Sequence, residues 1–244
     1  MALLLAVVSL SVHAEKLWTV DNFYVRLAYT LGGAMPLDMP ASIRGLNKFP
    51  LQPNYLVAAD VLHVVDKRWG VMVGLHLEKK AMETDATVKS YSMSITQGES
   101  TVSGVFTGYV NTQESQTLIT LPVQATYDIG KRWRLKLGPY ISYVVAAKFE
   151  GYAYNGYLRN GGPTGSKVYL GGDEDSRGNY DFAESMRKWQ WGLTLGADWY
   201  AGRNLGIFGG VKFGMNGIFE SDFDVVEQTM HPIYGELGVL YRLK

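Results

Sequence analysis

The chain has 244 residues, with 23 Lys and Arg against 23 Asp and Glu, and it contains no cysteine. The balanced charge gives no electrostatic reason to expect a nucleic-acid partner, and the absence of cysteine excludes a disulfide framework. Hydrophobic residues make up 47% of the chain. After the N-terminus, however, no apolar run reaches the ~18 residues that a transmembrane helix needs.

The first predicted segment is an export signal over residues 1–14. Ala2–Leu10 is a short apolar stretch, and the Val12 to Ala14 tripeptide resembles a small-residue cleavage site. The mature domain is then expected to cover 15–244. No basic residue precedes the apolar stretch, so two alternatives stay open: a true start further upstream, or a buried N-terminal strand or helix.

From residue 22 onward, apolar and polar residues alternate with a period of two, which predicts β-strands. The expected strands, placed to within about 2–4 residues, are 22–31, 54–65, 69–80, 117–128, 132–146, 188–200, 204–216 and 231–243. Most of them match or exceed the ~9–11 residues that a tilted strand needs to cross a bilayer.

The two faces of each strand differ in size as well as in polarity. In 188–200, for example, Leu193 and Leu195 share a face with other large apolar residues, whereas Thr194 and Asp198 lie on the opposite face. A soluble barrel would turn the apolar face inward. The polar face is also rich in Gly, Ala, Ser and Thr, which suit the crowded interior of a narrow barrel. The pattern therefore favours an apolar face turned outward toward lipid.

Aromatic residues gather at both ends of the apolar faces. Once the strands are laid antiparallel, one end carries Phe23, Trp69, Tyr127, Trp133, Trp199 and Tyr241. The other end carries Tyr29, Tyr55, Tyr143, Trp189 and Trp191. Trp and Tyr are stable at a membrane–water interface because their rings are apolar on one side and polar at the tip. Two aromatic girdles around an aliphatic band therefore predict a membrane-spanning barrel.

The connections alternate in length. Short turns are expected at 66–68, 130–131 and 201–204, and long connections at 32–53, 81–116, 147–187 and 217–230. This alternation is typical of bacterial outer-membrane barrels, which have short periplasmic turns and long extracellular loops. We therefore expect an all-β, transmembrane, antiparallel up-and-down β-barrel of about eight strands in the outer membrane of a Gram-negative cell.

The connection 81–116 has strand-like alternation of its own. We interpret it as an extension of two neighbouring strands into one long hairpin beyond the membrane, with its tip at Gly98. A ten-stranded barrel is the alternative. Glu83, Asp85 and Lys89 make the segment too polar to face lipid comfortably.

Charged residues recur on the inward face of the predicted strands. The set is Arg26, Asp60, His76, Glu78, Arg134, Lys136, Asp198, Lys212, Glu236 and Arg242. Charges held away from bulk water must be paired, and an eight-stranded barrel is just wide enough for side chains to fill it. We therefore predict an ion-paired polar network that fills the lumen. A narrow ion or water path is the alternative, and an open porin, which needs ~16–18 strands, is disfavoured.

Catalytic signatures are weak. His76 and Glu78 share a face and would suit a His–carboxylate pair, but no nucleophile in a recognisable strand–turn–helix setting accompanies them. We therefore expect a protein that is not an enzyme and that needs no cofactor and no metal.

Four strand segments resemble the PorT-like, or porin-like, outer-membrane β-barrel family: Leu121–Tyr127, Leu137–Tyr143, Trp191–Ala197 and Gly235–Arg242. The resemblance implies an outer-membrane barrel. It implies no particular activity, because these motifs are strand and turn signatures. The family's namesake assists a secretion and gliding apparatus, and no residue here marks that role.

We expect an integral outer-membrane protein that is structural or that binds a ligand or partner through its long outer loops. A small channel, or an accessory component of a transport or secretion system, is the alternative. The expected partners are outer-membrane lipid and an extracellular or periplasmic protein.

Overall fold

The computed structural model describes residues 21–38, 40–97, 100–223 and 229–243. The predicted signal peptide and the hairpin tip at Gly98 lie outside the described residues. Within these residues, no helix has both the length and the apolar character needed to cross a membrane.

Eight of the described strands form a closed antiparallel ring. In ring order they are β1 (Asn22–Pro36), β3 (Tyr55–Val64), β4 (Trp69–Gln97), β5 (Ser100–Ile129), β6 (Trp133–Asn160), β9 (Trp189–Tyr200), β10 (Leu205–Gly214) and β11 (Met230–Leu243). The ring closes because β1 pairs with β11 from Phe23↔Leu243 to Pro36↔Met230. The predicted all-β fold with eight strands in an up-and-down barrel is confirmed, and the ten-stranded alternative is wrong.

The alternation of the sequence sets which face of each strand is inside. Along β9, Leu193 and Leu195 are exposed while Thr194 and Asp198 are buried. Since successive side chains of a strand point to opposite faces, the ring acquires an apolar outer surface and a polar interior. Closure leaves no unpaired strand edge among these eight strands, as a structure surrounded by lipid requires.

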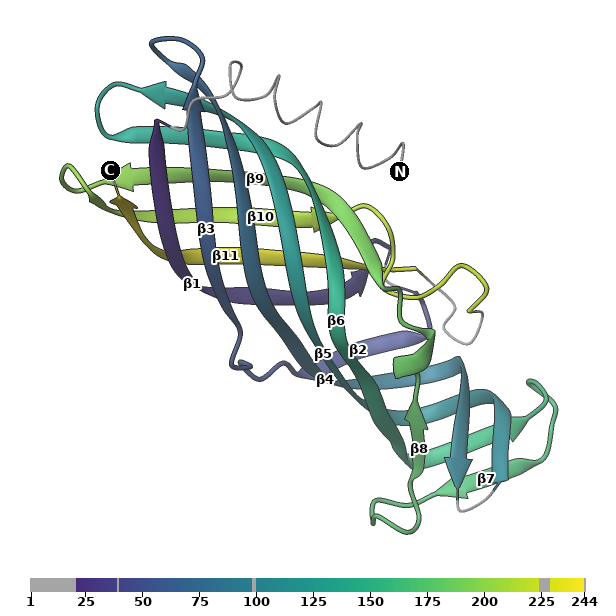
Figure 1. The fold of residues 1–244 in the computed structure, drawn as a ribbon. Coiled ribbons are helices and arrows are strands. Elements are labelled where there is room, and N and C mark those ends of the chain that lie inside the picture. Colours follow the sequence, from purple (N-terminus) through teal and green to yellow (C-terminus); the bar gives the residue numbers. More distant parts are fainter. Residues whose placement is uncertain (1–20, 39, 98–99, 224–228, 244) are drawn as a thin grey trace, which may run out of the picture.

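Three strands continue well beyond the ring. β4, β5 and β6 have 29, 30 and 28 residues, against 10 in β3 and in β10. Three short strands join their far halves: β2 (Ile43–Lys48) pairs with β4, β7 (Lys167–Leu170) pairs with β6, and β8 (Gly178–Asp181) pairs with both β4 and β6. We call β2, β7, β8 and the far halves of β4, β5 and β6 the extension (Figure 1).

The expected long connections are therefore more ordered than predicted. The segment 32–53 contains the end of β1 and all of β2, and 147–187 contains the end of β6, β7, β8 and the 3₁₀ turn η1 (Ala183–Ser185). The segment 81–116 forms the long hairpin that the sequence indicates, and its last described pair is Gln97↔Ser100.

The extension bends at irregularities that lie side by side in neighbouring strands. Ser90 in β4 and Asn155 in β6 have positive φ angles of 54° and 46°, and Gly108 in β5 has φ 156°. The ladders between these strands shift register at the same level. Irregularities of this kind increase local twist and bend a strand, so the outer third of the sheet turns away from the barrel axis (Figure 1).

Candidate functional site

The middle of the barrel is filled by an ion cluster around Arg26. Its guanidinium donates two parallel hydrogen bonds of 2.8 Å to Asp198 and a third, from Nε, to Asp60. Lys136 Nζ lies 2.8 Å from Asp198. Arg26 is only 1% exposed and Asp198 is fully buried. Four strands, β1, β3, β6 and β9, are thus tied together through the lumen.

A second cluster surrounds Glu78, nearer the long-loop end. Lys212 Nζ lies 2.6 Å from Glu78 Oε1 and 3.3 Å from Glu236 Oε2, and Lys80 Nζ lies 2.9 Å from Glu78 Oε2. Glu78 is also fully buried. Its charge is compensated by two lysines from different strands, as a buried carboxylate requires.

His76 links the two clusters. Its Nε2 lies 2.8 Å from Asp60 Oδ1, and its Nδ1 lies 3.5 Å from Lys212 Nζ. Neighbouring Gly74 leaves the room for this contact, because a Cβ at that position would meet the Asp60 carboxylate at 1.9 Å. The sequence predicts a pair between His76 and Glu78, but Glu78 Oε1 lies 3.9 Å from His76 Nδ1. The carboxylate closer to His76 is that of Asp60.

A third cluster lies at the short-turn end. Arg134 donates to both oxygens of Asp128 at 2.6 and 2.9 Å, and to the hydroxyls of Tyr24 and Tyr200 at 2.7 and 3.1 Å. Arg242 was predicted to belong to the ion-paired network of the lumen, and the structure places it outside that network. It does not join these ion pairs, because its guanidinium donates to the carbonyl of Arg203 in the last short turn and lies over the Tyr200 ring.

Sequence reasoning missed several interior residues. Lys80 follows Glu78 on the inward face but falls at the end of the expected strand. Tyr24, Tyr200 and Tyr234 are buried, but none of them belongs to the predicted network, which was chosen by charge. The alternation of the sequence already places Tyr24 and Tyr234 on the polar face of their strands, and the same alternation places Tyr200 there.

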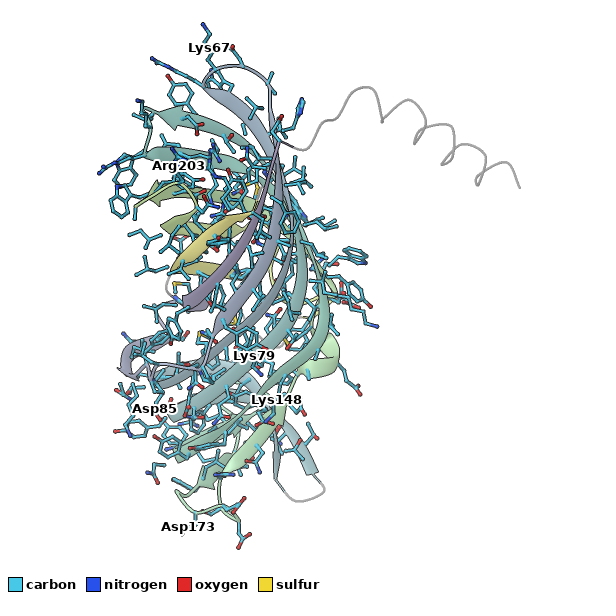
Figure 2. The ribbon with its side chains drawn as sticks, turned by 60° about the vertical axis from the view of Figure 1, so that its left-hand side comes forward. Lys67, Lys79, Asp85, Lys148, Asp173 and Arg203 are labelled. Carbon is cyan, nitrogen blue, oxygen red and sulfur yellow. The ribbon has the colours of Figure 1, made fainter. Side chains whose placement is uncertain are left out.

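The outer surface carries the predicted girdles. Phe23, Trp69, Tyr127, Trp133, Trp199 and Tyr241 all point outward near the short-turn end, where the Trp69 and Tyr127 rings lie 4.8 Å apart. At the other end Tyr143 and Trp189 lie 5.0 Å apart. In Figure 2, Lys67 and Arg203 lie at the short-turn end and Asp173 at the opposite tip, with Lys79, Asp85 and Lys148 between. The apolar band therefore lies between charged levels.

The lumen changes character above the Glu78 cluster. Gln190 donates to Gln116 at 2.6 Å, and Gln116 donates to the carboxyl of Glu114. Glu114 lies beyond the outer girdle, and burial raises its pKa to about 7 against the opposing effect of the hydrogen bond from Gln116. This layer separates the charged lumen below from the apolar interior of the extension above.

The extension has an apolar interior and a polar outer surface. Phe106, Phe149, Ala153 and Leu158 are among the buried residues of its core. Tyr180 on β8 ties the layers together, because its hydroxyl donates to the Asn111 carbonyl at 2.8 Å and contacts Thr112 Oγ1 at 2.7 Å. Its burial raises its pKa.

A cavity of about 410 Å³ opens in the extension, directly above the barrel. It lies among the end of β1, β2, the middle of β4, parts of β5, β6 and β8, and the first residue of β11. Its lining is mainly apolar and includes Ile43, Met82, Met93, Val110 and Phe149. A recess of this size and apolar character falls within the usual range for small-molecule sites.

A closed β-ring with a lipid-facing apolar band, two aromatic girdles and an ion-paired interior defines an integral outer-membrane β-barrel protein. The family described as "Outer membrane protein beta-barrel domain" matches residues 22–220. The chain belongs to this family, and its location is the outer membrane. The finer PorT-like resemblance stays a prediction.

Three solved structures show a distant similarity to the chain. OprG of Pseudomonas aeruginosa is 13% identical, with a TM-score of 0.41, over 92% of this chain and 96% of its own. Ail, the attachment invasion locus protein of Yersinia pestis, is 10% identical, with a TM-score of 0.38, over 92% and 100%. Neisserial surface protein A is 11% identical, with a TM-score of 0.32, over 91% and 96%. No curated protein matches the sequence.

Proposed function

We propose that the protein is a non-conducting surface barrel that binds a ligand or a partner outside the cell through its extension. The observation that carries this proposal is the filling of the lumen. Ion clusters around Arg134, Arg26 and Glu78 occupy successive levels from the short-turn end upward. A solute would have to break buried pairs at every level, and separating such pairs is costly.

The extension supports the binding half of the proposal. It is held by continuous ladders on β4, β5 and β6 and by a packed apolar core, so it presents a preformed surface. Preformed recognition surfaces lose little conformational entropy on binding. The extracellular protein partner and the PorT-like relationship predicted from the sequence belong to the same proposal, whereas a periplasmic partner would need a different binding surface.

The proposal includes the absence of catalysis. Among the described residues, His76 is the histidine inside the lumen, and its two ring nitrogens face Asp60 and Lys212. A general base needs a ring nitrogen directed at a nucleophile. Both nitrogens of His76 are used in the ion network, which supports a structural role.

A planar-bilayer recording of single channels tests the proposal. The intact protein should show no steady openings. Replacing Arg134, Arg26 and Glu78 together by alanine should introduce current, because one central residue is then removed from the ion cluster at each level of the lumen. The matched control replaces Lys148 and Glu150, an exposed ion pair of the extension, and should stay silent. Reproducible openings of the unmodified protein would contradict the proposal.

A narrow water or ion path is a second candidate, and one observation favours it. Thr30 Oγ1 and the Tyr234 hydroxyl are buried without a hydrogen-bond partner among the described residues. Both lie on neighbouring strands near the Glu236 level. Buried polar groups of this kind usually bind ordered water. Small reproducible currents that vanish when Tyr234 is replaced by phenylalanine would support this candidate.

A further inference from the structure

The cavity above the barrel is mainly apolar and is partly lined by methionine. Met82, Met93 and Met230 contribute to its wall, and Met82 and Met93 are buried. Methionine is unbranched and polarizable, so a wall built from it adapts to flexible apolar guests. Met82 also packs closely against Gly33, because a Cβ at that position would lie 2.2 Å from the Met82 sulfur.

The mouth of the cavity is formed by residues that line it and are also exposed. These are Met35, Arg44, Leu46 and Phe49, from the end of β1, from β2 and from the segment after β2. The apolar surface continues along the chain through Leu51, which is 72% exposed, to Tyr55 in the outer girdle. An apolar path of this kind joins the cavity to the outer edge of the lipid-facing band.

The charge at the mouth of the cavity is positive. Among the described residues that line the cavity, Arg44 is the charged one, and no described Asp or Glu lines it. Arg44 also forms no ion pair with another described residue. Guanidinium groups bind carboxylate, sulfate and phosphate oxygens through paired hydrogen bonds. An anionic head at the mouth and an apolar tail inside would therefore satisfy both parts of the site.

We propose that the cavity binds a single-chain anionic amphiphile, such as a fatty acid, with its hydrocarbon tail among Met82, Met93 and Phe149 and its head at Arg44. This inference deepens the proposed function, on which it rests, by naming the ligand class of the extension. The volume of about 410 Å³ suits one medium-length chain better than a two-chain phospholipid.

The test uses the intact protein in lipid nanodiscs and a fluorescent fatty acid that is displaced by dodecanoate. Saturable displacement above that of empty nanodiscs is the expected result. Ala86→Trp, at a lining position, should abolish it, whereas Thr87→Trp, at the adjacent position outside the lining, should leave it unchanged. Equal signals from protein-loaded and empty nanodiscs, or full binding by Ala86→Trp, would overturn the proposal.

The head group is tested separately, with a variant that leaves the wall intact. Arg44→Gln should weaken dodecanoate binding by about tenfold, the size expected for a lost charge-assisted hydrogen bond, and should leave dodecanol binding unchanged. A dodecyltrimethylammonium ion that binds wild type as tightly as dodecanoate would overturn the assignment of Arg44. The gel shift between unheated and boiled samples verifies that each variant is folded.

The amphiphile could enter the cavity from water or from the lipid bilayer, and two loading protocols distinguish these sources. Dodecanoate is added in water in one protocol and incorporated into the nanodisc lipid in the other, and saturation by either route supports the site. If dodecanoate fails to bind while bilayers remain silent, this inference fails and the non-conducting barrel stands. Steady channel openings would instead overturn the proposed function.

Discussion

The barrel and the extension share three strands but have opposite polarity. In the barrel the buried residues include ion-paired charges, such as Arg26 and Glu78, beside a smaller apolar cluster, and the exposed residues are apolar, as with Leu195. In the extension the buried residues are apolar, as with Phe106 and Leu158, and the outer face carries serines and threonines. The same hydrogen-bonded strands are thus surrounded by lipid in the barrel and by water in the extension.

On β4 and β5, every second side chain continues to point inward from the barrel into the extension, although the inward residues change from polar to apolar. Along β4 the inward positions run from Glu78 and Lys80 to Met82 and Val88, and along β5 they run from Gln116 and Glu114 to Val110. The solvent outside, and not the direction of the side chains, decides which residue types are stable inside. Substitutions at matched positions in the two regions should therefore have unequal effects.

The largest effect is expected from Asp198→Asn. This change leaves Arg26 and Lys136 without their shared carboxylate inside the lumen. Breaking a buried ion pair by removing one partner costs about 3–5 kcal/mol in the free energy of unfolding. Urea unfolding in liposomes, followed by tryptophan fluorescence, measures it. Asp173→Asn in the extension removes the same charge from an exposed loop and should change the free energy by less than about 0.5 kcal/mol.

The next effect concerns the outer faces. Leu195→Arg places a charge in the lipid-facing band of β9, midway between the girdles, and should cost about 2–4 kcal/mol. Thr101→Arg, on the exposed face of the extension, should be nearly neutral. The same unfolding measurement compares them. Equal costs at the two sites would contradict the assignment of lipid to one region and water to the other.

A smaller effect, dependent on pH, is expected at the boundary. The pKa of Glu114 is raised from 4.5 to about 7, so the folded protein retains a proton that the unfolded chain releases. The contribution of Glu114 to stability should therefore be present in full below about pH 4.5, should fall as the pH rises toward about 7, and should be lost above that pH.

The variant Glu114→Gln isolates this contribution, because it keeps the shape of the side chain without the titration. Unfolding curves at pH 5 and pH 8 should differ less for the variant than for wild type. A variant with the same pH slope as wild type would assign the slope to other groups.

The smallest effect is expected for an ion pair of the extension. Lys148 Nζ lies 2.5 Å from Glu150, and both side chains are exposed. Exposed pairs of this kind contribute about 0.2–1 kcal/mol, and salt weakens them. Lys148→Ala should therefore shift the unfolding midpoint slightly in low salt and not at all in high salt. A loss as large as that for Asp198→Asn would contradict the contrast between the two regions.

The part of the fold that lies in lipid could be predicted from the sequence. Lipid demands large apolar residues on one face, and a narrow interior demands small or paired residues on the other, so strands such as β9 and β10 carry a clear alternation. The expected bounds 188–200 differ by one residue from the observed Trp189–Tyr200. The same alternation places the outward aromatic residues and most of the inward charges.

The extension was harder to predict because both of its surfaces differ from those of the barrel. Water outside permits Ser and Thr, and the packed interior permits Met and Phe, so the continuation of β6 past Ala146 resembles a polar loop. β2, β7 and β8 are too short to show a period. The buried tyrosines were left out of the predicted network for another reason. The alternation places Tyr24 inside, but a choice of network residues by charge does not include a tyrosine whose hydroxyl accepts a hydrogen bond from Arg134.

The pairing of β1 with β11 has a consequence for how the protein is assembled. The seam joins the first and last strands of the ring, so no closed barrel exists until the whole chain has been delivered. Contacts so distant in sequence form slowly, and every intermediate exposes two unpaired edges that lipid cannot hydrogen-bond. Spontaneous insertion should therefore be slow. A cellular factor that shields both edges until they meet would accelerate closure without contributing to the final stability.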